Sequence, residues 1–255
     1  MLVFKYLAVM ELKVILVEPE YPINLGAIAR VMKNFGVKDL ILVNPKVSPD
    51  NEIARKFAVH AVEILENAQI VETLEEALNS IDLAIGTTGL AGEDYIPERT
   101  PINPEDFAKR LFLYAGSIGI VFGRESRGLD NKELKMLDFT VTIPTSQEYP
   151  VMNLSHAVGI ILYEIYKQRL KVSPPEIKDK LRKSTRDERE RAVNLWARFL
   201  DVLQYPKDLE KRKLYVLMFK RFLGRGFIYA KEVHSIYGPL RKATEILERC
   251  KNDND

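Results

Sequence analysis

The segment Asn24-Leu-Gly-Ala-Ile-Ala-Arg30 begins and ends with residues that are suited to binding a phosphate. An apolar run ends near Val17 before it, and helical periodicity begins at Asn24. Backbone N–H groups at a helix N-terminus favour an anion, and the planar guanidinium of arginine suits a phosphate. With small residues at Gly26 and Ala27, the segment predicts a phosphate-binding corner between Asn24 and Arg30. An ordinary helix cap followed by a surface arginine would give the same pattern.

Charged residues also follow the β-rich run Ile118–Phe122, in the loop Gly123-Arg-Glu-Ser-Arg-Gly128. Gly123 would let a ligand approach the backbone closely, because glycine has no side chain. Arg124, Glu125 and Arg127 would concentrate charge at the end of that strand. A glycine-containing turn with solvated charges is the alternative.

Two further polar loops leave β-rich runs, at residues 86–89 and 143–154, and a long helical stretch begins after Asn153 as its N-cap. In open α/β sheets, ligands bind beyond the carboxyl ends of the strands. We therefore expect these two loops and the loop 123–128 to meet around one pocket.

The composition excludes several common kinds of site. Neither the G-x-G-x-x-G fingerprint of dinucleotide-binding proteins nor the G-x-x-x-x-G-K-[ST] sequence of P-loop proteins occurs. Cys250 is the single cysteine and the three histidines lie far apart, so we expect no disulfide and no metal centre. No apolar run approaches the length of a membrane-spanning helix, so we expect a cytoplasmic protein.

The elements that must position these loops alternate along the first part of the chain. Five β-rich runs are expected as strands, at Val14–Val17, Leu40–Val43, Leu83–Gly86, Ile118–Phe122 and Thr140–Ile143. Helical patterns occupy Leu25–Phe35, Glu52–Asn67, Leu74–Asn79, Asn131–Leu137 and Leu154–Leu170. This alternation predicts an α/β fold, with a parallel sheet covered by helices on both faces.

The second part of the chain is expected to be a small helical domain. Ser173-Pro-Pro175 ends the long helix because proline cannot continue it, and the boundary placed there gives domains 1–172 and 173–255. Beyond it, helical spacing recurs in Asp187–Leu203, Leu209–Leu223 and Ala230–Arg249, with breaks expected at Gly224-Arg-Gly226 and Gly238-Pro239.

Charge divides the chain at nearly the same place. Residues 1–166 hold 15 Lys and Arg against 23 Asp and Glu, whereas residues 167–255 hold 23 against 13. This asymmetry favours a basic domain that meets a polyanion, with Lys220, Arg221 and Arg225 on an exposed helical face. A solvated surface rich in both charges, as in many heat-stable proteins, explains the counts equally well.

Three segments, in this order, resemble the motifs of SPOUT 2′-O-ribose methyltransferases: Asn24–Arg30, Val121-Phe-Gly-Arg-Glu125 and Met152-Asn-Leu154. The resemblance covers about residues 12–170. Glu148-Tyr149 and the helical tail are similar to the TrmJ subfamily, which acts on the first nucleotide of the tRNA anticodon loop, cytidine at position 32. The resemblance to SPOUT methyltransferases implies a C-terminal trefoil knot in the sheet domain, which residue patterns alone would disfavour. It also implies a homodimer with the active site at the subunit interface.

The resemblance also implies roles for individual residues. Asn24, Arg30 and Glu125 would act on the RNA. Because of their charge, Arg124, Arg127 and the basic residues of the tail are also expected to contact it. Because Arg30 stays protonated, it would bind the neighbouring phosphate and stabilise the developing alkoxide. The proton acceptor is left open among the phosphate, Arg30 and water. The cofactor S-adenosylmethionine would be bound by Thr87, Thr88, Gly89, Gly123, Ile143, Met152, Asn153 and Leu154.

One segment departs from the family pattern, and two other functions fit the same residues. Relatives often carry serine where this chain has Pro150-Val-Met152. Any role that this serine has in the relatives therefore cannot be performed by the same segment of this chain. An rRNA 2′-O-ribose methyltransferase would share the catalytic core, and a non-catalytic RNA-binding protein could keep the fold. The intact Asn24, Arg30, Glu125 and Asn153 favour an enzyme, and tRNA is the expected substrate.

Overall fold

The computed structural model describes residues 10–89, 101–111, 116–171, 182–226 and 228–252. The chain forms two compact units, Met1–Ile177 and Lys178–Asp255. The domain boundary expected at residues 173–175 lies outside the described residues.

The first unit is built on a parallel sheet of seven strands in the order β3-β2-β1-β6-β4-β7-β5. The middle of the sheet is buried on both faces, because helices cover both, and residues such as Val14 and Ile120, which pair across β1 and β6, are fully buried. The strands are β1 (Met10–Val17), β2 (Asp39–Val43), β3 (Gln69–Val71), β4 (Leu83–Thr87), β5 (Pro101–Ile102), β6 (Gly116–Phe122) and β7 (Phe139–Val141). The predicted parallel sheet is confirmed, and the trefoil knot stays a prediction.

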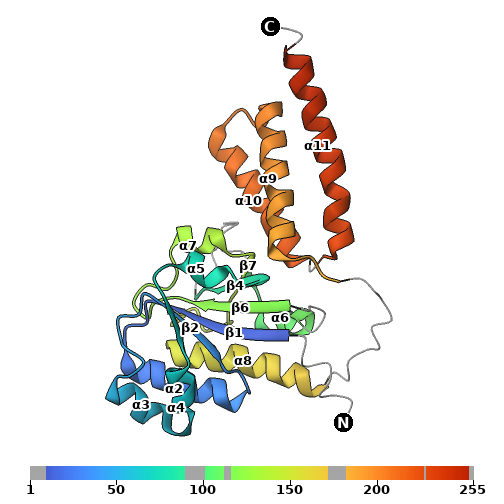
Figure 1. Cartoon of the computed structure of the whole chain (residues 1–255). Coiled ribbons are helices and arrows are strands. Elements are labelled where there is room, and N and C mark those ends of the chain that lie inside the picture. The colour runs from blue at the N-terminus through green and yellow to red at the C-terminus, as the bar shows by residue number, and fades with distance from the viewer. Residues whose placement is uncertain (1–9, 90–100, 112–115, 172–181, 227, 253–255) are drawn as a thin grey trace. The chain divides into compact units, whose positions relative to one another are not determined.

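Helices cover both faces of this sheet (Figure 1). On one face lie α2 (Pro22–Asn34), α3 (Glu52–Ala58), α4 (Val62–Glu66) and α8 (Leu154–Lys171), and α6 (Pro104–Leu111) packs against α8. On the other face, α5 (Leu74–Leu78) and α7 (Asn131–Met136) share a buried apolar cluster with β1, β2, β4 and β6. The two-sided cover therefore leaves the C-terminal ends of the strands as the place where loops can form a site.

Several predicted boundaries are wrong, and each has a local cause. The helix expected over Glu52–Asn67 ends at Ala58, because Val59 takes a positive φ of 54° and a short 3-10 turn follows. Helix α2 begins at Pro22, since proline suits the first position of a helix, so Asn24 is not its N-cap. The short strands β3 and β5 and helix α6 were not predicted.

The second unit contains α9 (Arg186–Leu203), α10 (Leu209–Arg225) and α11 (Ala230–Asn252). Helix α9 packs against both others around Ala192, Val193, Leu223 and Val233. The break expected at Gly238-Pro239 is wrong, because α11 continues through Pro239. Its packing along α9 outweighs the single backbone hydrogen bond that a proline cannot donate. No helix in the described part of the chain is long and apolar enough to span a bilayer.

Acid should weaken the second unit through Glu188, which the sequence did not single out. Its carboxylate accepts hydrogen bonds from Arg182, from the Thr185 backbone N–H and from His234 Nε2 at 2.8 Å. The Arg182 hydrogen bond is the main reason that the pKa of Glu188 falls from 4.5 to about 2. Because the folded pKa is the lower one, this stabilisation is complete above about pH 4.5 and is lost as the pH falls towards 2.

The measurement is amide hydrogen exchange of α9 in the full chain between pH 2 and 6. Glu188→Gln should lower the protection of α9 against exchange at pH 6 and should remove much of the pH dependence of that protection. Asp187→Asn is the matched control, because within the described residues the ion pair of Asp187 is an exposed one with Arg191, and its loss should leave the profile unchanged. A Glu188→Gln profile that follows the wild type at every pH would contradict the assignment.

Candidate active site

A cavity of about 330 Å³ opens in the first unit where three neighbouring strands end. Its walls are the residues that follow β4, β6 and β7, together with the first turns of α8. Parallel strands place their carboxyl ends at one edge of the sheet, which is why segments far apart in the sequence meet there. The prediction that the loops 86–89, 123–128 and 143–154 surround one pocket is confirmed. The volume lies within the range of small-molecule sites, roughly 300–1,000 Å³.

The cavity collects most of the residues expected to hold a cofactor. Seven of the eight line it: Thr87, Thr88, Gly89, Gly123, Ile143, Met152 and Leu154. The eighth, Asn153, is directed elsewhere: its Oδ1 accepts the backbone N–H of Ser155 at 2.9 Å and so caps α8, as predicted. The lining combines hydroxyl groups and backbone of the β4 loop with the apolar side chains after β7, so it suits a ligand with an apolar ring and polar edges.

Gly123 is required for a reason different from the one predicted. A Cβ atom at this position would lie 2.1 Å from the carbonyl carbon of Gly128. The loop folds back on itself there, since Arg124 and Gly128 exchange backbone hydrogen bonds of 3.3 and 2.9 Å. The close approach is therefore made by the protein's own backbone, and the folded-back loop forms one wall of the cavity.

Gly123→Ala should lower the free energy of unfolding by about 1–3 kcal/mol, because the added methyl group has no flexible neighbour that could move away. Gly89→Ala is the matched control in the same cavity: its nearest neighbour would be the Pro150 carbonyl oxygen at 3.8 Å, an ordinary contact. Urea unfolding of the two variants measures the difference. Equal stability of both would show that the loop has another conformation available.

The anion expected at the start of α2 is supplied by the protein itself. The Glu125 carboxylate accepts the backbone N–H groups of Glu20 and Tyr21, at 2.9 and 3.3 Å, and the side-chain amide of Asn24 at 3.0 Å. A carboxylate at a helix N-terminus is favoured for the same electrostatic reason as a phosphate. The predicted phosphate-binding corner is thus wrong at Asn24, whose amide group holds Glu125.

Asn24 connects two of the motif segments. Its Oδ1 accepts a hydrogen bond from Asn153 Nδ2 at 3.0 Å, while its own amide donates to Glu125. The Glu125–Asn24–Asn153 chain therefore joins α2, the β6–α7 loop and the start of α8 beside the cavity. Asn24 is buried, so each of its hydrogen bonds is costly to lose.

Arg30 lies away from this centre, on the exposed surface of α2. Among the residues that the structure describes, it forms no hydrogen bond or ion pair and does not line the cavity. Gly26 does not leave room for a ligand beside it, because it packs against α3 with the Ala54 carbonyl where a side chain would be. Arg30 is thus a cation on the exposed surface of the first unit.

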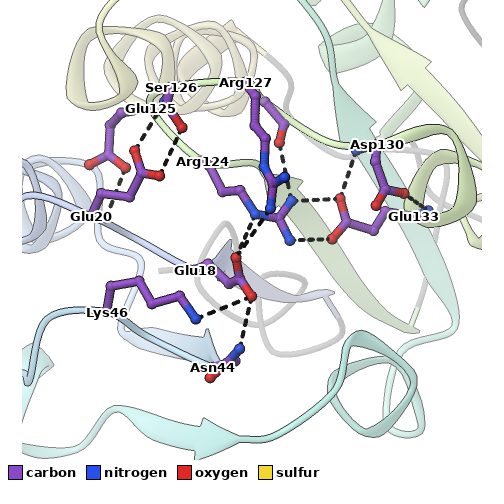
Figure 2. A network of polar contacts seen from close by, with 11 residues as sticks. Glu18, Glu20, Asn44, Lys46, Arg124, Glu125, Ser126, Arg127, Asp130 and Glu133 are labelled. Carbon is purple, nitrogen blue, oxygen red and sulfur yellow. Dashed lines mark hydrogen bonds and ion pairs between the residues drawn. The ribbon is translucent and has the colours of Figure 1, made fainter.

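Arg124 has a structural role in this chain, not the expected contact with RNA. Its guanidinium is 8 % exposed and forms ion pairs with Glu18 at 2.7 Å and Glu133 at 2.9 Å. Figure 2 shows it lying between these two carboxylates, which belong to the end of β1 and to α7. Its hydrogen bond is the main cause of the lowered pKa of Glu18. With its donors used inside the protein, Arg124 is not free to bind a phosphate.

The acidic partners of this loop were not predicted. Glu18 has a positive φ of 45° and accepts a hydrogen bond from Asn44, which also has a positive φ, of 43°. Glu20 accepts hydrogen bonds from the backbone and hydroxyl groups of Ser126, as Figure 2 shows. The only signal in the sequence is the pair of acidic residues that directly follows the first strand, Glu18-Pro-Glu20.

The exposed basic face predicted for α10 is wrong. Lys220 is paired with Glu190 at 2.9 Å and its side chain is 14 % exposed, while Arg221 is buried. The apolar Phe222 beside it is 66 % exposed. Arg225 is half-buried. Of the five arginines and lysines expected to contact RNA, Arg127 is the one with a largely exposed side chain, 69 %.

The fold and the cavity define the class: an α/β protein with a small-molecule site beyond the carboxyl ends of parallel strands, beside a polar centre formed by three loops. The family model described as the SpoU rRNA Methylase family matches residues 11–163, and the chain belongs to this family. Among the described residues, no group of three His, Cys, Asp or Glu is placed to hold a metal ion.

Two relatives and one solved structure match nearly the whole chain. The tRNA (cytidine-2'-O-)-methyltransferase TrmJ of Methanocaldococcus jannaschii is 42 % identical over 88 % of this chain and 96 % of its own length. The protein of the same description from Sulfolobus acidocaldarius is 33 % identical over 96 % and 99 %. The crystal structure of TrmJ from Z. mobilis ZM4 has a TM-score of 0.67 at 25 % identity, covering 90 % and 97 %. These comparisons confirm the resemblance found in the sequence.

Proposed function

We propose that the chain is an S-adenosylmethionine-dependent tRNA 2′-O-ribose methyltransferase that acts on cytidine at the first position of the anticodon loop. The observation that carries the proposal is the cavity at the ends of β4, β6 and β7, beside the Glu125–Asn24–Asn153 chain of hydrogen bonds. The two relatives that cover most of the chain, both described as tRNA (cytidine-2'-O-)-methyltransferases, support the substrate. A tRNA substrate in turn supports a cytoplasmic location.

The residues around the cavity fit the cofactor. Ile143, Met152 and Leu154 would provide apolar walls for an adenine ring, and the β4 loop with Thr88 and Gly89 would provide polar backbone groups. When bound, S-adenosylmethionine supplies a methyl group on a positively charged sulfur, which the ribose 2′-oxygen takes up. Because the methyl group is already activated, the protein needs chiefly to hold the two reactants in line.

The protein's own residues would then position the ribose and the charge that develops on it. Glu125 and Asn153, both held by Asn24, keep the β6–α7 loop and the start of α8 in one arrangement. Arg30 would bind the phosphate next to the reacting ribose and stabilise the forming alkoxide, since its guanidinium remains charged. The hydroxyl proton would leave to the phosphate or to water.

The surface position of Arg30 supports a homodimer in which each site uses two protomers. Arg30 does not line the cavity of its own chain. In the proposed dimer, Arg30 of one protomer would face the cavity of the other, so the active site would form at the subunit interface. An unpaired surface cation on α2 is what such an arrangement needs.

The test is transfer of labelled methyl groups to purified tRNA and, separately, to purified rRNA. Transfer to tRNA alone supports the proposal, and transfer to rRNA alone supports an rRNA methyltransferase. Calorimetry with S-adenosylmethionine tests the third function: a non-catalytic RNA-binding protein without a cofactor site would release no heat on mixing.

A further inference from the structure

The loop between β7 and α8, which forms part of the cavity wall, carries an aromatic side chain that packing does not explain. Tyr149 is 81 % exposed, the largest exposed fraction of any large apolar or aromatic side chain in the described residues. Tyrosine usually buries most of its ring, so an exposed one beside a ligand cavity is a candidate contact for that ligand or its partner. It belongs to the loop between β7 and α8.

The local structure holds Tyr149 at this place. Its backbone N–H donates to the Ser146 carbonyl at 3.2 Å, and the Thr145 hydroxyl donates to the Pro150 carbonyl at 3.0 Å, which closes the turn. Thr145 and Pro150 both line the cavity, so the two ends of the turn form part of its wall. Pro150 also restricts the backbone of the residue before it, so less conformational freedom is lost when the Tyr149 ring binds something.

The space left for a nucleotide is at the mouth of the cavity, because the cofactor of the proposed function fills its interior. Two exposed groups belong to the loops that line the cavity: the Arg127 guanidinium on the β6–α7 loop and the Tyr149 ring on the β7–α8 loop. A cation and an aromatic face are the groups that bind a phosphate and an unstacked base. A ribose held between them would lie at the opening, next to the Glu125–Asn24–Asn153 chain.

We infer that Tyr149 stacks on the base of the nucleotide that is methylated and so holds its ribose at the mouth of the cavity. The inference rests on the proposed function. Stacking is tolerant of base identity, because every base has a π-face, so Tyr149 fixes the position of the nucleotide and does not select cytidine.

The experiment uses the full chain, S-adenosylmethionine and tRNA. Tyr149→Ala should raise KM for tRNA about fivefold or more, since one base–aromatic stack is worth roughly 1–3 kcal/mol and 1.4 kcal/mol is tenfold. Tyr149→Phe should keep the wild-type KM, because the ring remains. Cofactor affinity should be unchanged in both. A fluorescent cytidine analogue at the target position should be quenched by the wild type and by Tyr149→Phe but not by Tyr149→Ala.

Ile70→Ala is the matched control. Ile70 is 56 % exposed on β3, at the edge of the sheet away from the cavity strands, and its loss should change none of these quantities. If the wild type methylates tRNA while Tyr149→Ala keeps both its KM and the quenching, the inference is overturned and the proposed function stands. If the wild type methylates no tRNA, the proposed function fails, and the inference fails with it.

Discussion

Arg30→Ala should reduce methyl transfer to tRNA by at least about 10²- to 10³-fold, the loss typical of removing one group that stabilises charge in the transition state. Binding of S-adenosylmethionine should stay at the wild-type level, since Arg30 does not line the cavity. The fold should also be unaffected, because this exposed side chain forms no ion pair or hydrogen bond with the described residues. Single-turnover methyl transfer and calorimetry measure the two quantities.

Two control variants show whether the guanidinium group itself is needed, and whether it is needed at position 30. Arg30→Lys should also be poor, because an ammonium group cannot reproduce the planar two-pronged contact with a phosphate. Arg55→Ala removes another surface arginine, one that pairs with Glu66 on the neighbouring helices, and should leave the rate unchanged. If Arg30→Ala lost cofactor binding and activity together, Arg30 would belong to the cofactor side of the site.

The same variant tests whether each site uses two protomers. Arg30→Ala can be co-expressed with Gly89→Trp, in which the indole should block the cavity; the Cβ atom at this position would make only an ordinary contact, 3.8 Å from the Pro150 carbonyl oxygen. In a mixed dimer, one site would combine the intact cavity of the first variant with Arg30 of the second. Activity should therefore return in the mixture, although each variant alone is inactive. A mixture that stays inactive would indicate that Arg30 acts on the cavity of its own chain.

Arg124→Met should lower the free energy of unfolding by about 3–5 kcal/mol, the usual cost of removing one partner from a buried ion pair. The Glu18 and Glu133 carboxylates would remain largely buried, at 18 % and 13 % exposure, without the cation between them. Methionine keeps the length and apolar stem of the side chain, so the change is chiefly one of charge. Urea unfolding of the full chain measures the loss.

Arg127→Met is the matched control, three residues along the same loop. Arg127 lies 3.7 Å from the same Glu18 but is 69 % exposed, so water replaces it at little cost. We expect a change below about 1 kcal/mol, as for other surface pairs. If the two variants were equally stable, Arg124 would not be the centre of the loop network in Figure 2.

The position of the site was predictable because the site lies where the parallel strands end. β-rich runs such as Leu83–Gly86 and Ile118–Phe122 are marked by their composition, and parallel strands bring the loops that follow them to one edge of the sheet. The gathering of Gly89, Gly123 and Leu154 around one cavity follows from this rule without any knowledge of side-chain contacts.

The partners of the charged residues were not predictable, because pairing depends on three-dimensional neighbours. Arg124 and Arg127 look alike in the sequence, yet one is buried between two carboxylates and the other is exposed. The acidic Glu125 took the place expected for a substrate phosphate, since both are anions suited to the same helix N-terminus. In α10, helical periodicity could not tell which face would be buried, and Arg221 went inward while Phe222 stayed exposed.

The most direct test of the proposed function is to map the methylated nucleotide. Unmodified tRNA is incubated with the full chain and labelled S-adenosylmethionine, digested into fragments, and sequenced by mass spectrometry. The proposal predicts one added methyl group per tRNA, on the ribose 2′-oxygen of cytidine at the first position of the anticodon loop. A methyl group on a base, on a ribose elsewhere in the tRNA, or found only when rRNA is supplied would contradict it.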